Sequence, residues 1–213
     1  MFMENVAHKV ASLLLEIEAV KLSPNAPFKW SSGWLSPIYC DNRLTLSYPE
    51  IRTYIKNAFV DLIKAKFPDV EAIAGVATAG IPQGALVADA MGLPFVYVRS
   101  EAKKHGMTNL IEGKVKPSQK IVVIEDLIST GGSSLKVVDV LREENCNVLG
   151  LVAIMTYGFE VASKAFEEKN VPFHTLSNYN FVLSEALKQN IISVDMEKSL
   201  EDWRKEPSSW QGI

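Results

Sequence analysis

The chain has 213 residues, with 22 basic and 25 acidic side chains and a net charge of -3. This length suits one globular domain with a substantial core, or one domain with a small attachment. With 47% hydrophobic and 22% charged residues, the composition excludes disordered and fibrous proteins, and an isoelectric point near 5.7 argues against a general nucleic-acid binder.

The first predicted element is an amphipathic helix near the N-terminus. Apolar residues recur at helical spacing from Val6 to Ile17, and charged residues interrupt them, unlike the unbroken apolar stretch of a signal peptide. No segment of the sequence is apolar over a length that spans a bilayer. We therefore expect a cytoplasmic protein with no membrane partner, in which Cys40 and Cys146 are two reduced thiols rather than one long-range disulfide.

Residues 22–43 form a stretch rich in proline, serine and tryptophan. Its prolines and Gly33 disfavour a helix and favour short strands and turns, and a helical pattern follows from Tyr48 to Phe67. We assign residues 1–45 to the N-terminal helix and a small hood, and residues 46–213 to a core domain. Aromatic rings in the hood could stack on a flat ligand, although such residues more often fill a core.

Beyond residue 70, short apolar runs alternate with helical segments. The predicted strands cover residues 72–77, 93–98, 121–124, 148–155 and 173–176, and the predicted helices cover about 80–91, 132–145 and 160–169. Continuous apolar strands separated by helices predict an α/β fold whose central, mostly parallel sheet is flanked by helices. Ligands bind such sheets beyond the carboxyl ends of the strands, so the turns there are candidate sites.

The turn after the first of these strands contains Thr78, Ala79 and Gly80. Residues this small let backbone amides approach the oxygens of a pyrophosphate, and Pro82 suits the start of the following helix. A tight turn without a ligand is the alternative interpretation.

A long segment without apolar periodicity follows the second strand. Residues 100–116 predict a mobile basic loop, which begins after Arg99 and contains Lys103 and His105. Cations there could neutralise a pyrophosphate leaving group, and closure of the loop could exclude water. The alternative is a solvated loop whose lysines merely aid solubility.

The turn after the third strand combines features that suit a phosphorylated sugar. Glu125 and Asp126 can accept hydrogen bonds from sugar hydroxyls or hold a metal ion through water. Glycines let the backbone close around a phosphate, hydroxyls add donors, and a helix N-terminus favours a dianion. A helix cap is the alternative, but the complete pattern favours a phosphate cradle comprising Leu127, Ile128, Ser129, Thr130, Gly131, Gly132 and Ser133.

Together these segments resemble the type I phosphoribosyltransferases, and in particular the orotate phosphoribosyltransferases. Residues 122–134 resemble the phosphoribosyl-pyrophosphate motif, residues 99–106 the R-x-x-x-K-x-H-G element, and residues 28–39 the F-x-[LW]-x-S-G-x-x-S-P-x-Y signature. The resemblance covers about residues 16–157. It implies the type I fold with an N-terminal hood, transfer of a phosphoribosyl group to orotate in pyrimidine biosynthesis, Mg²⁺ as cofactor, and a homodimer with shared active sites.

The resemblance also implies roles for single residues. Arg99, Lys103 and His105 match positions that contact phosphoribosyl pyrophosphate, and Lys103 is expected to affect the rate most. Glu125 and Asp126 are the other expected catalytic residues, whereas Mg²⁺ is expected to be held mainly by substrate and water, with no direct protein ligand. The expected contacts of orotate are Lys29, Ile38, Tyr39 and Ser129.

The sequence departs from the family pattern at three places. Ser100 stands where many members have lysine, Ala79 replaces a lysine of the pyrophosphate turn, and residues 155–158 lack an arginine that some members direct at the orotate carboxylate. Lys29, the backbone of residues 32 and 33, or Ser129 could hold that carboxylate instead.

Two other functions stay open at this point: a phosphoribosyltransferase for another base, and a non-catalytic sensor of phosphoribosyl pyrophosphate that binds DNA or RNA. The basic loop and the net charge weigh against the sensor. Residues 191–213 carry no chemical motif, so we expect Trp203 and Trp210 to pack against the domain.

Overall fold

The computed structural model describes residues 2–30, 33–100 and 110–210. Its first part comprises α1 (Phe2–Glu16), β1 (Val20–Leu22), β2 (Phe28–Lys29), β3 (Leu35–Ser36), β4 (Ile38–Cys40) and the 3-10 helix η1 (Asn42–Ser47). Strand β1 pairs antiparallel with β4, and β2 pairs antiparallel with β3. The short strands predicted for the proline-rich stretch are confirmed. Pro37 separates β3 from β4, because proline cannot donate a hydrogen bond to a strand ladder.

A six-stranded sheet forms the centre of the molecule. Its strands are β5 (Ala72–Val76), β6 (Phe95–Val98), β7 (Ile111–Glu112), β8 (Lys120–Ile128), β9 (Asn147–Thr156) and β10 (Phe173–Asn178), in the order β10-β9-β8-β5-β6-β7. Neighbouring strands are parallel, except that β7 runs antiparallel to β6. The mostly parallel sheet is therefore confirmed.

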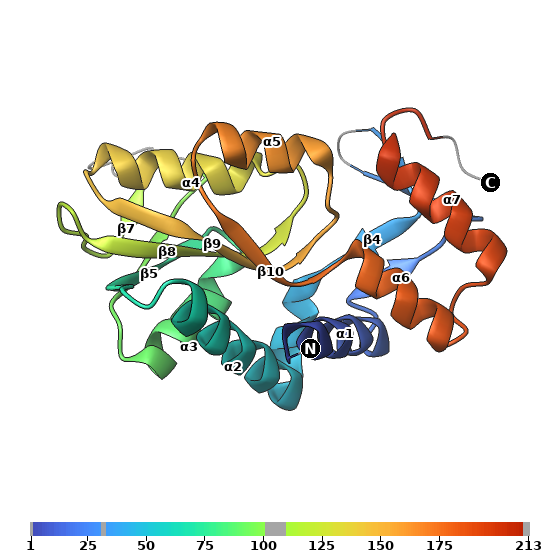
Figure 1. Ribbon diagram of the computed structural model, residues 1–213, viewed down its shortest axis with the longest axis horizontal. Coiled ribbons are helices and arrows are strands. Elements are labelled where there is room, and N and C mark those ends of the chain that lie inside the picture. The colour runs from blue at the N-terminus through green and yellow to red at the C-terminus, as the bar shows by residue number, and fades with distance from the viewer. Residues whose placement is uncertain (1, 31–32, 101–109, 211–213) are drawn as a thin grey trace.

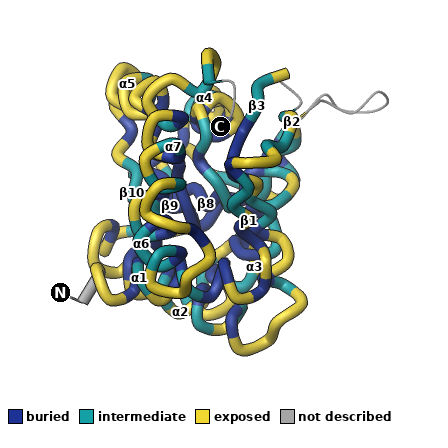
Figure 2. The backbone as a smooth tube through the Cα atoms, turned by 90° about the vertical axis from the view of Figure 1, so that its right-hand side faces the viewer, coloured by how far each residue is buried: buried dark blue, intermediate teal, exposed yellow. Residues whose placement is uncertain are grey.

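Helices cover both faces of this sheet (Figure 1). They are α2 (Pro49–Lys66), α3 (Gly80–Met91), α4 (Gly132–Glu143), α5 (Glu160–Glu168), α6 (Tyr179–Lys188) and α7 (Val194–Lys205). Helices α4 and α5 lie on one face, and α1, α2 and α3 lie on the other. Alternate residues of β8 enter the two cores: Val122 and Ile124 join the core on the α2 side, and Ile121 and Val123 join the core on the α4 side. Figure 2 shows the buried backbone of β8 and β9 at the centre.

The structure corrects one strand boundary that matters for the site. The third strand of the series was predicted to end at Ile124, yet β8 continues through Ile128. Strand β9 is long enough to supply partners for this extension, with Glu125 opposite Ala153 and Ile128 opposite Thr156. The acidic pair therefore belongs to the last part of a strand rather than to a turn.

The predicted loop 100–116 is also partly corrected. Its residues 111–112 form the edge strand β7, and the amide of Arg99 donates a hydrogen bond to the carbonyl of Leu110 at 2.9 Å. Residues 101–109 lie outside the described residues, so the structure does not address their predicted mobility.

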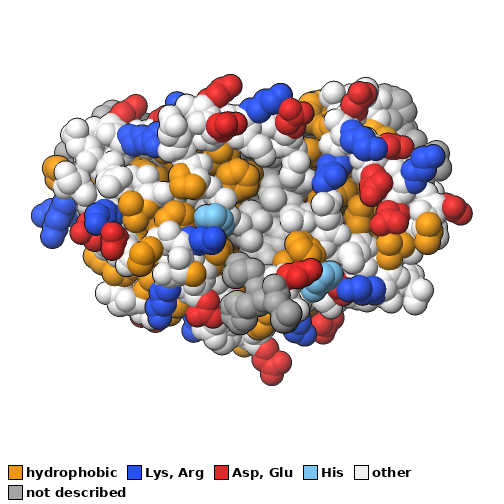
Figure 3. Space-filling view, viewed as in Figure 1, with side chains coloured by type: hydrophobic (Ala, Val, Ile, Leu, Met, Phe, Trp, Pro, Cys, Tyr) orange, Lys and Arg blue, Asp and Glu red, His pale blue; other side chains and the backbone are white. Residues whose placement is uncertain are grey.

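The C-terminal segment packs onto the domain, as expected. Trp203 is fully buried in the same apolar core as residues of α1 and α2, and Trp210 packs against that core. Cys40 and Cys146 are both free thiols, which confirms that prediction. Among the described residues, no helix has both the length and the apolar character needed to cross a bilayer. Charged side chains of both signs are spread over the face in Figure 3.

Candidate active site

Glu125 and Asp126 lie side by side where β8 extends past its neighbour β5. The side chain of Glu125 is buried, with only 6% of the residue exposed. One of its oxygens accepts a hydrogen bond from the Asp126 amide at 3.0 Å, and the other accepts one from the Ser134 hydroxyl of α4 at 3.2 Å. These bonds hold the carboxyl group of Glu125 against the start of α4.

The two carboxyl groups perturb each other because both are withdrawn from water. Burial raises the pKa of Glu125, and the negative charge of Asp126 raises it further. Burial also raises the pKa of Asp126, although hydrogen bonds and the charge of Arg43 act in the opposite direction. The pair is therefore poised to share a proton, and a nearby positive charge would favour its fully ionised form.

The segment after β8 leads into the N-terminus of α4 and contains most of the residues predicted as the phosphate cradle, whereas Leu127 and Ile128 of that prediction lie within β8. Gly131 adopts a φ of 84°, and a Cβ atom at this position would lie 2.8 Å from the ring of Phe166. A residue with a side chain would therefore have to move this turn away from α5. The cradle and the turn after β5 together line a cavity of about 300 Å³. Its lining comprises Ala77, Thr78, Ala79, Glu125, Asp126, Leu127, Ser129, Thr130, Gly131, Gly132, Ser133 and Ser134.

The turn after β5 approaches the end of β8 very closely. A Cβ atom on Gly80 would lie 2.4 Å from the carbonyl oxygen of Ile124, so only glycine fits here. The peptide between Ala77 and Thr78 is cis. The close approach brings Thr78 and Ala79 into the wall of the cavity opposite the cradle, whereas Gly80 itself is buried behind them.

A second cavity of about 590 Å³ adjoins the first. Its walls come from the hood and from the ends of β8 and β9: Lys29, Trp30, Trp34, Tyr39, Cys40, Leu127, Ser129, Thr130 and Tyr157. Trp30 and Tyr157 pack with their ring centroids 5.4 Å apart. The cavity is therefore largely aromatic, with the ammonium group of Lys29 as the basic side chain among the lining residues.

Most of the predicted site residues are brought together around these two cavities, but some are not. Ile38 is fully buried, and its amide and carbonyl both bond to the Ser36 hydroxyl. Ile128 is also fully buried. Arg99 follows β6 outside both linings, with Nη1 3.6 Å from Oε1 of Glu112. Lys103 and His105 lie outside the described residues.

The structure adds site residues that sequence reasoning did not single out. Trp30 and Trp34 line the second cavity, and their place within an aromatic hood was the available signal. Tyr157 follows β9 directly, so it stands at the same sheet edge as the end of β8. Asn42 touches Asp126 from the hood, and no local pattern in the sequence indicates that contact.

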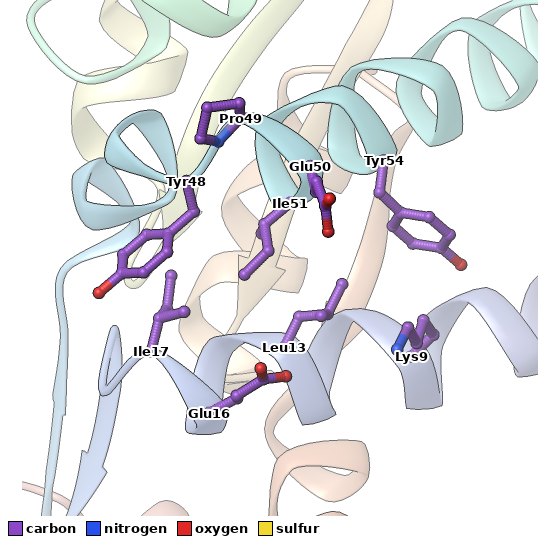
Figure 4. Close-up of a pocket in the computed structure, with 9 residues that line it drawn as sticks. All are labelled: Lys9, Leu13, Glu16, Ile17, Tyr48, Pro49, Glu50, Ile51 and Tyr54. Atoms are coloured by element: carbon purple, nitrogen blue, oxygen red, sulfur yellow. The ribbon is translucent and has the colours of Figure 1, made fainter.

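A larger groove of about 750 Å³ lies elsewhere, between α1 and the start of α2 (Figure 4). Leu13, Ile17 and Ile51 contribute apolar side chains to it, and Tyr48 and Tyr54 stand at its two sides. It contains neither a paired-carboxylate strand end nor a glycine cradle among its lining residues. Size alone therefore does not identify the reactive site, and we assign it to the two adjoining cavities.

Comparison with known proteins identifies the family of the chain. The model of the phosphoribosyl transferase domain matches residues 43–190. The chain is 56% identical to the orotate phosphoribosyltransferase of Cytophaga hutchinsonii over 207 residues, which cover 97% of this chain and 99% of that protein. It is also 56% identical to the orotate phosphoribosyltransferase of Bacteroides thetaiotaomicron, over 98% of each chain. The solved orotate phosphoribosyltransferase of Aeropyrum pernix is 26% identical, with a TM-score of 0.74 over 86% of this chain and 99% of that one.

Proposed function

The chain belongs to the phosphoribosyl transferase domain family and, within it, to the orotate phosphoribosyltransferases, and we propose that its two adjoining cavities hold the two substrates of that enzyme. The reaction transfers the 5-phosphoribosyl group of 5-phospho-α-D-ribose 1-diphosphate to orotate in pyrimidine biosynthesis. N1 of orotate releases its proton to water and bonds to C1 of the ribose, while the bond from C1 to the diphosphate breaks. Pyrophosphate leaves with the electron pair, and orotidine 5'-phosphate is formed.

One observation carries this arrangement: the two cavities share a wall. Leu127, Ser129 and Thr130 line both of them. A ribose bound beside the acidic pair would therefore have its reacting carbon next to the aromatic cavity. Such proximity converts an encounter between two molecules into a reaction within one complex.

The first cavity has the chemistry of a ribose-phosphate site. The backbone amides of the cradle and the N-terminus of α4 favour a phosphate group. Glu125 and Asp126 can accept hydrogen bonds from the ribose hydroxyls. As pyrophosphate departs, positive charge develops at C1, and this charge would lower the pKa of both carboxyls and favour their ionised forms.

The second cavity has the chemistry of a flat, anionic base site. Rings such as Trp34 and Tyr39 offer faces for stacking, and the ammonium group of Lys29 can attract a carboxylate. Lys29 is an exposed residue at the end of β2, on the lining of this cavity. It is therefore our choice among the candidates for holding the carboxylate of orotate.

Mg²⁺ fits the chemistry of the first cavity, because this ion usually keeps several water ligands, and the acidic pair can accept hydrogen bonds from them. Among the described residues, no group of three or more histidine, cysteine, aspartate or glutamate side chains could hold a metal ion. We propose that Glu125 and Asp126 hold Mg²⁺ only through water and substrate. When bound, the ion would supply positive charge against the diphosphate.

The basic loop completes the proposal. Arg99, Lys103 and His105 would neutralise the departing pyrophosphate when the loop closes. We also propose a homodimer with shared active sites, in which this loop reaches the partner, and a cytoplasmic location. Light scattering on the purified protein tests the dimer, because a monomeric mass at assay concentrations contradicts it.

The function is tested by mixing the protein with Mg²⁺ and phosphoribosyl pyrophosphate, and adding orotate, uracil, adenine or hypoxanthine in turn. We expect pyrophosphate release with orotate. Release only with another base would mean a different substrate, and no release with any base would favour the sensor.

The role of Lys29 is tested by the variant Lys29→Met, which keeps much of the side-chain volume but removes the charge. We expect the KM for orotate to rise about 10-fold or more, with little change in the KM for phosphoribosyl pyrophosphate. Lys56→Met is the control, because Lys56 is a half-buried lysine on α2, outside the lining of both cavities. An unchanged KM for orotate in Lys29→Met would contradict this role.

A further inference from the structure

Asn42 connects the hood with the catalytic strand end. It is the first residue of η1, near the end of the hood, and only 1% of it is exposed. Its Nδ2 donates a hydrogen bond to the backbone carbonyl of Asp126 at 2.8 Å, across 84 positions of the sequence. Its Oδ1 accepts a hydrogen bond from the thiol of Cys40 at 3.3 Å. Cys40 lines the second, aromatic cavity, and Asp126 lines the first cavity, so the side chain of Asn42 bonds to a lining residue of each.

The backbone of Asp126 needs such a partner. The pairing of β8 with β5 ends at Ile124 and Gly75, whereas β8 continues to Ile128. Two side chains bond to the backbone groups of Asp126 beyond that point. Glu125 accepts from its amide, and Asn42 donates to its carbonyl. The peptide that carries this carboxylate is thus held by side chains where the sheet gives it only one neighbouring strand.

Asn42 is in turn anchored in the protein interior. The backbone carbonyl of Asn42 accepts a hydrogen bond from the Thr45 hydroxyl at 2.6 Å, and that hydroxyl accepts one from Nε2 of Gln83 on α3 at 3.2 Å. Thr45 and Gln83 are both buried. Hydrogen bonds are stronger in such a dry environment, and a buried polar side chain with satisfied bonds favours one conformation. Asn42 is therefore a rigid point of attachment.

We propose that Asn42 is a positioning residue that sets the place of Asp126 and couples the occupancy of the two cavities. This inference rests on the proposed function, because it requires the cavities to hold the two substrates of one reaction. Orotate contacting the hood strand at Cys40 favours this bonded conformation of Asn42, and Asn42 thereby holds the peptide of Asp126 in place. Bound orotate should therefore strengthen the binding of phosphoribosyl pyrophosphate. Because coupling between sites is reciprocal, bound phosphoribosyl pyrophosphate must strengthen orotate binding by the same factor.

The inference is tested with two variants of Asn42. Asn42→Asp keeps an acceptor for the Cys40 thiol but removes the donor to Asp126, and Asn42→Leu removes both bonds at similar volume. We expect kcat to fall at least 10-fold in both, since small displacements of reacting groups cost about that much or more. We also expect the effect of orotate on phosphoribosyl-pyrophosphate affinity to disappear in both, as measured by calorimetry in EDTA, where the two substrates do not react. Either variant can carry the test if the other does not fold.

A matched control separates this role from a purely structural one. Ser177→Ala removes a buried hydrogen bond of the same kind, from the Ser177 hydroxyl to the carbonyl of Ala7 at 2.9 Å, on strand β10. It should lower the melting temperature while leaving kcat and the coupling unchanged. Folded Asn42 variants whose kcat and coupling lie within about twofold of the wild type would overturn the inference. A wild-type protein that releases no pyrophosphate with orotate would instead refute the proposed function, and the inference with it.

Discussion

Replacing Glu125 by glutamine is expected to make the protein more stable above pH 7 and less active. Glu125 is 6% exposed, and its burial beside Asp126 raises its pKa. Glutamine has nearly the same shape. It keeps an acceptor for the Asp126 amide and can donate to the Ser134 hydroxyl, which are the present partners of Glu125. The variant therefore removes mainly the ionisable charge.

The pH dependence follows from the direction of the pKa shift. Because the pKa of Glu125 is raised in the folded state, its contribution to stability is complete below the unfolded pKa near 4.5 and is lost as the pH rises through the folded-state pKa. Each pH unit between the two pKa values corresponds to about 1.4 kcal/mol. Since a buried ion costs several kcal/mol at most sites and Asp126 can share the proton, we expect the glutamine variant to be more stable by about 1–3 kcal/mol at pH 8. The difference should nearly vanish near pH 4.5.

Urea unfolding of the ligand-free protein at both pH values measures this difference. Glu143→Gln is the matched control, because Glu143 is an exposed carboxylate on α4. In the pyrophosphate-release assay, Glu125→Gln should lower kcat about 10-fold or more, because a charge that stabilises the cationic ribose is lost. A variant no more stable than the wild type at pH 8, or equally stabilised at both pH values, would refute the argument from burial.

Three further predictions concern the turns, the core and the metal. Gly80→Ala places a methyl group 2.4 Å from the Ile124 carbonyl oxygen. We expect urea unfolding to show a free energy of unfolding lower by about 2 kcal/mol, and the pyrophosphate-release assay to show a large loss of activity. A variant with near-normal stability and activity would contradict the close approach. Trp203→Ala removes a fully buried ring and its hydrogen bond to the Leu35 carbonyl, and should cost about 3–5 kcal/mol in urea unfolding, against about 1 kcal/mol for the partly buried Trp210→Ala. Chelation of Mg²⁺ by EDTA should stop pyrophosphate release without changing the unfolding midpoint of the ligand-free protein; retained activity would exclude the ion.

Local patterns were sufficient for the main elements of the fold. The apolar runs predicted β5, β6, β9 and β10 to within two residues at each end, because a strand covered on both faces must be apolar throughout. They failed at β8, where Glu125 and Asp126 are acidic and yet belong to the strand. Polar residues interrupt the apolar pattern of the sequence, but the pairing of β8 with β9 continues because strand pairing depends on backbone hydrogen bonds and not on side chains.

The sequence by itself determined the chemistry of this protein: the order of strand, acidic pair, glycine cradle and helix is contiguous, so a local pattern records it. Tertiary structure alone decided how that chemistry is arranged. It buried Ile38 in the core, brought Tyr157 beside Trp30, and placed Asn42 against the carbonyl of Asp126. These contacts join residues far apart in the chain, so they depend on the path of the whole backbone and on how the hood packs over the sheet. That Glu125 is an acid follows from the sequence. The direction of its pKa shift does not, because it depends on the packing that removes water from this side chain.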